Sequence, residues 1–388
     1  MTTPTNSVLI VGASARYAAQ SALAAGVECW AVDLFGDWDL QRVANSFVIE
    51  SLSGLKIDEI LDWCNGIENW LMVGGIENRF DLIRQLGQRL RLLGPTLSSF
   101  ENSKDIAKIQ FVCAQDGISF PASHRVDERK MPPGSGDWLL KPIESAGGHQ
   151  IKWACEFNDS DLRERFYLQR YIAGGSFSAV YCSSGKNSQL IGVTKQLCGC
   201  EPFINAQKQF AYCGSIGPIE IEKSLKFELE KIGRTIASEL GMVGVFGIDF
   251  VVSDSQRIWL IEINPRIPAS GEVFEKAGVI DSLVRLHLAG CDSHPLPDVS
   301  PKNNFVGKAI VFNRREGFVV EDAIFDDWMQ ILDRDNDALA DVPMPGSLVS
   351  IDAPILTVFA KGESQCVVRE KLELAARNIL ERIKKLEV

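Results

Sequence analysis

The spacing of hydrophobic residues along the first hundred positions predicts alternating strands and helices. Residues 7–12 and 27–32 are short apolar runs typical of buried strands, and the alanine-rich segment between them ends at Gly26, as a helix often does. A strand, a helix and a second strand in this order favour a parallel sheet, so we expect a Rossmann-like α/β domain over residues 1–100. Three further elements complete it: a strand at 70–74, a helix at 79–92 and a turn at Gly94-Pro95.

From residue 102 the pattern predicts helices that flank a longer series of strands. Residues 102–117 have the polar start and the glycine end of a capped helix. Residues 224–240 carry apolar side chains three and four positions apart, which indicates an amphipathic helix. We expect these helices to belong to a central region, residues 101–295. The segments between them are predicted as strands at 138–142, at 166–181 in two parts and at 191–200, and as a polar loop at 207–218.

Two apolar segments at 248–253 and 257–263, joined by a polar turn, predict an antiparallel hairpin. If residues 255–256 form a two-residue loop, the register places Asp249 directly opposite Glu262. Carboxylates in directly opposed positions, about 5 Å apart, repel each other. The hairpin therefore predicts a cation between these two acids.

The same hairpin suggests which cation it would hold. Alternation puts Leu260, Glu262 and Asn264 on one face, so the site offers oxygen ligands beside an apolar floor. Oxygen ligands of this kind suit Mg²⁺ that arrives with nucleotide phosphates. The alternative is that the two acids lie on a solvated face and bind no metal.

The C-terminal part is predicted as a small mixed domain at residues 296–388. It follows a helical segment at 272–290 and contains strands at 305–313 and 349–357 and a charged closing helix at 370–386. We find no internal repeat along the chain.

Composition narrows the class of protein. Of the 388 residues, 46% are hydrophobic and 23% charged, as in ordinary globular proteins. The net charge of −11 argues against a nucleic-acid surface, which needs an excess of lysine and arginine. The N-terminus has no basic region, and its apolar run is too short for a membrane span, so we expect a cytoplasmic protein. The ten cysteines show no zinc-site spacing and are expected to be reduced thiols.

One loop has the composition of a phosphate site. The strand at 138–142 carries Lys141 and leads into the small residues Ser145, Gly147 and Gly148. Such a loop lets backbone N–H groups approach phosphate oxygens, with a lysine as a point charge. A plain turn beside a surface lysine explains the same residues. A dinucleotide site at residues 12–17 is a poorer alternative, because the three spaced glycines are incomplete there.

Taken in order, these features resemble the ATP-grasp ligase superfamily over about residues 5–365: the lysines, the small-residue loop, the segment 169–172 and the run Glu262-Ile-Asn-Pro-Arg266. The resemblance implies an ATP-grasp fold of the α/β (α+β) class. In a fold of this kind we expect a Rossmann-like pre-ATP-grasp domain first, ATP between two antiparallel sheets, and a small mixed domain at the end. The resemblance also implies ligation of a carboxylate to an amine through an acyl phosphate, which consumes ATP with Mg²⁺, or Mn²⁺ in its place, and releases ADP and phosphate.

The resemblance assigns roles residue by residue. Gln169 stands where the family has a glutamate that meets the adenine amino group, and the backbone N–H of Ile172 would read the ring. Ser176 replaces the acid that usually holds the ribose hydroxyls. The residues assigned to the nucleotide are Lys104, Lys141, Ser145, Gly147, Gly148, Gln169, Ile172, Ser176 and Leu260.

The resemblance assigns the metal and the catalytic step to residues of the hairpin and its end. Asp249, Glu262 and Asn264 match the family's magnesium ligands. Arg266 matches the arginine that holds the acyl phosphate as charge builds, a task that suits the bidentate geometry of a guanidinium. The alternative for Arg266 is an arginine that anchors a surface turn.

The type of ligase is less sharply indicated. No biotin attachment segment is evident, and residues 194–197 and 210–218 resemble ligases that join an amino acid to an amine, such as tyramine–glutamate ligases of methanofuran-type cofactor synthesis. In such an enzyme Lys195, Gln196 and Tyr212 would face the substrate. We expect small carboxylate and amine substrates, with no nucleic acid or membrane as partner, and we allow for a homodimer. Because Ser176 replaces an acid, the alternative is a degenerate nucleotide-binding or regulatory protein without turnover.

Overall fold

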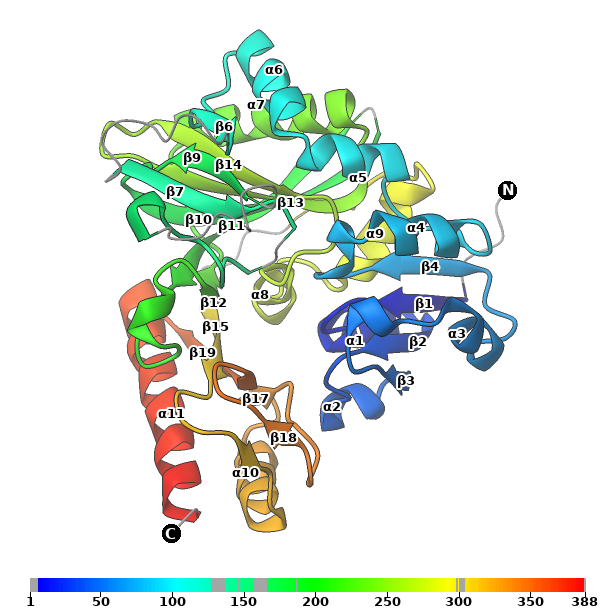
Figure 1. Cartoon of the computed structure of the whole chain (residues 1–388), viewed down its shortest axis with the longest axis vertical. Coiled ribbons are helices and arrows are strands. Elements are labelled where there is room, and N and C mark those ends of the chain that lie inside the picture. Colours follow the sequence, from blue (N-terminus) through cyan, green and yellow to red (C-terminus); the bar gives the residue numbers. More distant parts are fainter. Residues whose placement is uncertain are drawn as a thin grey trace.

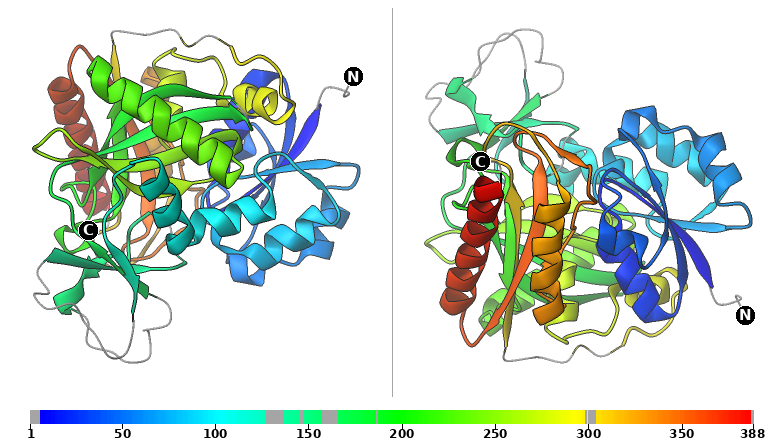
Figure 2. Two further views of the ribbon diagram at one scale, coloured as in Figure 1. Left: turned by 90° about the horizontal axis from the view of Figure 1, so that it is seen from above. Right: turned by 90° about the horizontal axis from the view of Figure 1, so that it is seen from below.

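The chain is built around a long antiparallel sheet with smaller sheets at its sides (Figure 1). The computed structural model describes residues 6–126, 137–144, 147–156, 166–185, 187–297, 299 and 304–386. Within this part of the chain the strands form sheets of five, eight, four and two strands. The two views of Figure 2 show the N-terminal elements at one side of the molecule and the C-terminal helix α11 at the other.

The N-terminal sheet is parallel, as the sequence predicts, with the strand order β3-β2-β1-β4-β5. The predicted helix at 79–92 is too long: it ends at Gly87, and residues 91–92 pair with β4 as an edge strand. The strands are β1 (Ser7–Val11), β2 (Glu28–Asp33), β3 (Asn45–Val48), β4 (Asn69–Met72) and β5 (Arg91–Leu92). The helices are α1 (Arg16–Ala25), α2 (Trp38–Gln41), α3 (Ile57–Trp63) and α4 (Phe80–Gly87).

The predicted single helix at 102–117 is two helices, α5 (Leu97–Lys104) and α6 (Ile106–Gln115). The side chain of Thr96 accepts a hydrogen bond from the Ser99 N–H and caps the first helix. Asp105 breaks the run because its carboxylate caps the second helix, where it accepts from two backbone N–H groups. These helices lead into a four-stranded sheet of order β6-β9-β7-β8: β6 (Ser123–Arg125), β7 (Trp138–Pro142), β8 (Lys152–Trp153) and β9 (Phe166–Arg170).

The eight-stranded sheet runs in the order β14-β13-β10-β11-β12-β15-β19-β17. The two predicted strands within 166–181 belong to different sheets, since β9 pairs with β6 and β7 while β10 pairs with β11 and β13. The predicted loop at 207–218 contains a strand, β12, which pairs with β11 and β15, so the C-terminal strands extend the same sheet. Its strands are β10 (Gly175–Ser184), β11 (Ser188–Cys198), β12 (Tyr212–Gly217), β13 (Val243–Val252), β14 (Ile258–Asn264), β15 (Phe305–Phe312), β17 (Leu339–Ala340) and β19 (Pro354–Gly362).

Helices cover both faces of this long sheet. Helix α7 (Lys223–Leu240) and α6 pack on the half that holds β10, β13 and β14. Helices α10 (Asp322–Arg334) and α11 (Gln365–Leu386) pack on the half that holds β15 and β19. A short two-stranded sheet, β16 (Phe318–Val319) with β18 (Leu348–Val349), lies beside this half.

The predicted helix at 272–290 is divided into α8 (Gly271–Lys276) and α9 (Leu283–Cys291), and the Ser282 side chain caps the second. Apolar residues of both helices share one core with α1, β1 and the adjacent face of β10 and β13. This core joins the N-terminal sheet to the eight-stranded sheet.

Among the described residues, no helix has both the length and the apolar character that a membrane crossing requires.

Candidate active site

A cleft of about 360 Å³ lies between the four-stranded and the eight-stranded sheet, and we call it the inter-sheet cleft. Lys104 lies in an adjoining pocket that shares Lys141 and Glu262 with the cleft. Ser145 lies outside the described residues. Most of the residues expected from the sequence line the cleft: Lys141, Gly147, Gly148, Gln169, Ile172, Ser176, Asp249, Glu262, Asn264 and Arg266.

Asp249 and Glu262 are register partners on β13 and β14, as expected, although the turn that leads to them was predicted incorrectly. The Ser253 N–H bonds to the Arg257 carbonyl, so three residues form the loop, and the third, Gln256, has a φ of 59°. A three-residue loop shifts the pairing by one position. A β-bulge between the pairs 249/262 and 250/260 shifts it back, which is why the two acids still face each other.

The bulge also exchanges the residues that face the cleft, so the expected role of Leu260 as its apolar floor is wrong. Leu260 is fully buried in the core beneath α7, together with Phe250 and Ile258. Ile261 lines the cleft instead. Strict alternation breaks at the bulge because one strand has an extra residue there.

This exchange predicts different defects for two neighbouring alanine variants. Leu260→Ala should lower the free energy of unfolding by about 2–5 kcal/mol, because it opens a cavity in the core. Ile261→Ala should fold with nearly normal stability and weaken nucleotide binding instead. Urea unfolding and calorimetric titration with Mg·ATP measure the two effects. The assignment is wrong if Leu260→Ala changes nucleotide affinity more than Ile261→Ala does.

The facing carboxylates have opposite pKa shifts. Burial and the negative charge of Glu262 raise the pKa of Asp249 to about 6. Burial alone would raise the pKa of Glu262, but Lys104 and Lys141 lower it below its usual range. The oxygens of Asp249 accept hydrogen bonds from Gln196 Nε2 and Asn264 Nδ2, each at 3.0 Å. Two carboxylates and an amide fit a divalent cation that prefers oxygen ligands.

As the Mg²⁺ ligand expected from the sequence, Asp249 with its raised pKa should make Mg²⁺ binding depend on pH. A proton on Asp249 would compete with the metal, so affinity should fall about tenfold per pH unit below about pH 6 and level off above it. Calorimetric titration of Mg²⁺ in the presence of ATP between about pH 5 and 8 measures this. Asp249→Asn is the control, with weak binding that does not change in the same range. Unchanged affinity of the native protein from pH 7 to 5 would contradict the assignment.

Two lysines provide positive charge next to the acids. Lys104 Nζ lies 3.2 Å from Glu262 Oε1. Lys141 is buried, and its Nζ donates to Gln169 Oε1 at 3.1 Å. Burial alone would lower the pKa of Lys141, but Tyr167, Glu262 and Asp249 raise it above its usual value, so this lysine is charged in the cleft.

Arg266 is held by a residue that the sequence analysis missed. Its Nε and Nη2 donate to Glu77 Oε1 at 3.0 and 2.9 Å, and Nη2 also donates to Asn264 Oδ1 at 3.1 Å. Glu77 is 1% exposed and follows β4, at the carboxyl edge of the N-terminal sheet. A buried arginine in this pairing is not the surface anchor of the alternative interpretation. Glu77 had a sequence signal, since an acid after Gly74-Gly75 at the end of a parallel strand lies where such sheets bind ligands.

Two of the three residues expected to face a substrate line the inter-sheet cleft, namely Gln196 and Tyr212. Lys195 is exposed and is absent from the lining among the described residues. Successive side chains of β11 point to opposite faces of the sheet, so Lys195 and Gln196 cannot both face the cleft. Apolar and aromatic residues complete the lining, among them Tyr171, Phe210 and Val251.

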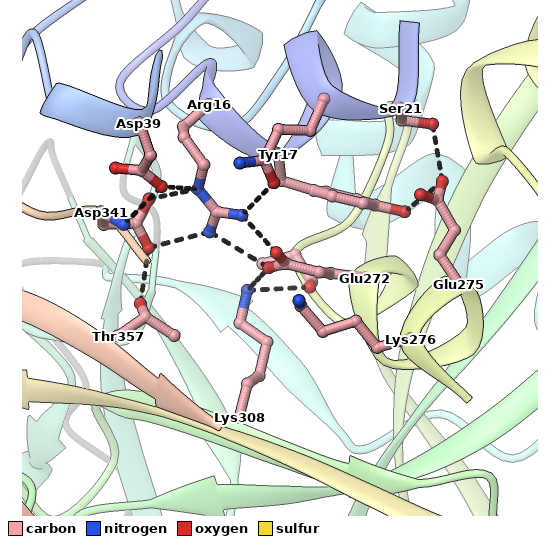
Figure 3. Close-up of polar contacts among 12 residues, drawn as sticks. Arg16, Tyr17, Ser21, Asp39, Glu272, Glu275, Lys276, Lys308, Asp341 and Thr357 are labelled. Carbon is pink, nitrogen blue, oxygen red and sulfur yellow. Dashed lines mark hydrogen bonds and ion pairs between the residues drawn. The ribbon is translucent and has the colours of Figure 1, made fainter. Parts of the chain in front are cut away.

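A buried ion network anchors the segment that follows Arg266 (Figure 3). Arg16, on α1, pairs with Glu272 on α8 and with Asp341, whose oxygens lie 2.9 and 3.0 Å from Nε and Nη2. Lys308, on β15, donates to Glu272 at 2.7 Å and to the Ala269 carbonyl at 3.3 Å. The network therefore ties the N-terminal sheet, α8 and the eight-stranded sheet together. It fixes residues 269–272, a few positions beyond Arg266.

Comparison with known proteins points to one family. Residues 108–270 match the model of the ATP-grasp domain. The formate-dependent phosphoribosylglycinamide formyltransferase of Bacteroides fragilis is 22% identical over 303 residues, which cover 76% of this chain and 74% of the relative. The D-alanine–D-alanine ligase of Fusobacterium nucleatum is 26% identical over 188 residues, which cover 46% of this chain and 61% of the relative.

Two solved structures share the fold over nearly the whole chain. The ADP complex of an N5-carboxyaminoimidazole ribonucleotide synthetase superposes with a TM-score of 0.72 at 14% identity and covers 98% of both chains. The biotin carboxylase domain of the Hydrogenobacter thermophilus 2-oxoglutarate carboxylase, solved with MgADP, ADP and bicarbonate, has a TM-score of 0.70 at 14% identity. It covers 95% of this chain and 89% of that one. The chain thus has the fold of these two structures, one solved with ADP and the other with MgADP, and its residues 108–270 belong to the ATP-grasp domain family.

Proposed function

We propose that the protein joins a small carboxylate to a small amine through an acyl phosphate and releases ADP and phosphate. The observation that carries this proposal is the set of charges in and beside the inter-sheet cleft, where Asp249 and Glu262 face Lys104, Lys141 and Arg266. Two carboxylates suit a metal that neutralises phosphate, and three cations suit the anions of a phosphoryl transfer.

In this proposal the nucleotide lies between the two sheets, with its base toward β9 and its phosphates toward β14. The backbone N–H of Ile172 would read the adenine ring, with Gln169 beside it and Ser176 at the ribose. Mg²⁺ held by Asp249, Glu262 and Asn264 would neutralise charge on the phosphates. Lys104 and Lys141 would bind phosphate oxygens, Lys141 from a buried position.

Arg266 is proposed to stabilise the acyl phosphate. Glu77 and Asn264 hold Nε and Nη2, whereas Nη1 makes one long contact, of 3.5 Å, with the Ile267 carbonyl. That nitrogen therefore has donor capacity left for an anionic oxygen while the Glu77 pair stays in place. Glu77 is then a positioning residue, since it acts by orienting the guanidinium.

The order of domains is part of the proposal. Residues 1–100 would supply the carboxyl edge that holds Glu77. Residues 101–295 would supply the nucleotide site, and residues 296–388 the strand that carries Lys308. The substrates of the relatives do not transfer at these identities, and the resemblance to tyramine–glutamate ligases stays a prediction. A protein that binds ATP without turnover is the second candidate, supported by Ser176 at the position of the ribose acid.

The test is an ADP-release screen of the full chain with Mg·ATP, amino acids as carboxylates and a panel of primary amines. We expect release with at least one pair, and we expect hydroxylamine in place of the amine to trap the acyl phosphate as a hydroxamate. Glu262→Gln should fold normally and release no ADP. Glu59→Gln, which removes one partner of the exposed pair with Lys56, is the matched control and should keep full activity.

The outcomes separate the two candidates. Mg·ATP binding with ADP release at background for every pair would support the protein without turnover. Turnover retained in Glu262→Gln would reject the metal assignment but not the ligase. ADP release without hydroxamate would reject the acyl-phosphate route.

A further inference from the structure

A second cavity lies where the N-terminal sheet meets the C-terminal strands, and we call it the Asp37 cavity. Its volume of about 360 Å³ is within the range of small-molecule sites. The lining comes from the loops after β1 and β2, from the segment after β17 and from β18 and β19. In the described part of the chain, it shares no lining residue with the inter-sheet cleft.

Asp37 is among the residues that line this cavity, and one of its carboxylate oxygens has no partner. The residue is 3% exposed, and its Oδ2 makes no hydrogen bond to any described residue. Asp37 occupies the N-cap position of α2, yet its side chain makes no capping bond. A buried carboxyl without a partner lowers the stability of the fold. A ligand that supplies the missing partner explains why the position is acidic.

The neighbouring acids already have partners. Asp33 accepts from three backbone N–H groups, and Asp39 from the N–H groups of Asp341 and of the residue after it. Asp341 accepts from Arg16 and from the hydroxyl of Thr357. Asp37 is therefore the acid of this group that has capacity for a ligand.

The charge around the cavity favours a cation. In the described part of the chain, the ion pairs of this region use two bases, Arg16 and Lys308, and both are bound to Glu272. Burial, together with Asp341, Asp33 and Asp39, holds the pKa of Asp37 well above its usual range. The neighbouring acids that help to raise this pKa repel a phosphate or a carboxylate, whereas a positive group beside Asp37 would stabilise its ionised form.

The remaining walls select an organic cation over a metal ion. They are largely apolar, with Leu34, Phe35, Pro343, Leu348, Val349 and Ile355 among the lining residues. Phe35 is 40% exposed and Leu348 is 68% exposed, so apolar surface faces solvent beside the cavity. An aromatic ring also attracts ammonium groups.

We propose that the Asp37 cavity binds a small organic ammonium ion with an apolar body, with the ammonium at Asp37 and the body against Phe35 and Leu348. The site is distinct from the inter-sheet cleft. The proposal does not rest on the proposed function, because the amine is bound here without nucleotide.

The first test uses the native full-length chain without ATP. Calorimetric titrations compare butylamine, cyclohexylmethylamine and 2-phenylethylamine, each with the alcohol of the same skeleton. We expect at least one amine to bind about tenfold or more tightly than its alcohol, as a charge-assisted bond to a buried carboxylate implies. If no amine binds more tightly than its alcohol, the proposal fails.

A variant pair locates the site. Asp37→Asn keeps the shape of the side chain and should abolish the preference for amine over alcohol while Mg·ATP binding stays unchanged. It should also melt at the same or a higher temperature than the native protein, because it removes a buried acid that has no partner. Asp58→Asn, at a side chain that is 89% exposed, is the control and should bind amines normally. Unchanged amine affinity in Asp37→Asn would overturn the proposal.

An amine bound in the Asp37 cavity has one of two roles, as a substrate or as an effector. Mass spectrometry after incubation with Mg·ATP and the carboxylate panel distinguishes them. An amine that the native protein consumes and Asp37→Asn does not is a substrate delivered through this site, whereas an amine that binds the native protein and persists is an effector. An amine that both proteins consume equally, without binding at Asp37, counts against the site.

Discussion

Arg266→Ala should reduce ADP release in the presence of both substrates by about 10²–10³-fold, while Mg·ATP still binds. The reason is that the guanidinium faces the cleft and would stabilise charge that builds only during phosphoryl transfer. Arg266→Lys should restore a small part of the activity, because an ammonium keeps the charge but loses the bidentate fork. Steady-state ADP release and calorimetric titration with Mg·ATP measure the two effects.

Glu77→Gln tests whether the pair positions Arg266. It should lower the maximal rate about tenfold or more and leave the KM for ATP nearly unchanged, since in the proposed site Glu77 acts through the arginine that it binds. Arg89→Ala, at a side chain that is 61% exposed, is the control and should behave as the native protein. Full activity in Arg266→Ala would show that this residue has only a structural role.

Glu272→Gln should lower the free energy of unfolding by about 3–5 kcal/mol, because it leaves Arg16 and Lys308 buried with one counter-charge fewer. Glu59→Gln, at an exposed pair, should cost less than about 1 kcal/mol. Urea unfolding of both variants checks the difference. The loss of Glu272 should also loosen residues 269–272, so hydrogen exchange there should rise before the protein unfolds.

Glu272 also makes the stability of the protein depend on pH in the acid range. Burial alone would raise the pKa of Glu272, but Arg16 and Lys308 lower it from 4.5 to about 2 in the folded protein. Its contribution is therefore complete above about pH 4.5 and is lost as the pH falls toward about 2. In this range the native protein should lose stability faster than Glu272→Gln does. Parallel pH profiles of the two proteins would contradict the assignment.

The hairpin shows how far sequence pattern could carry the site. The opposition of Asp249 and Glu262 followed from apolar periodicity and one assumed turn, and it is correct. The turn itself was wrong, and a bulge compensated for it. A bulge is set by how neighbouring strands pack and leaves no periodic signal in the sequence. For this reason the pattern could not predict that Ile261, and not Leu260, faces the cleft.

Other differences have the same origin in tertiary pairing. The segment at 91–92 has helical neighbours in sequence and becomes a strand because β4 offers a free edge. Residues 212–217 were expected to form a loop because they are polar and glycine-rich, and they form a strand because β11 and β15 pair with them on both sides. Local propensity is weak where such pairing is available.

The sequence by itself determined the parallel N-terminal sheet, the acids of the hairpin, the two lysines and Arg266, because strand periodicity and motif order are local properties. The tertiary structure decided what these residues contact. Glu77 meets Arg266 from 189 positions away, and Arg16 meets Asp341 from 325 positions away. Such contacts depend on how separate sheets pack together, and so does the unpartnered oxygen of Asp37, which no pattern along the chain encodes.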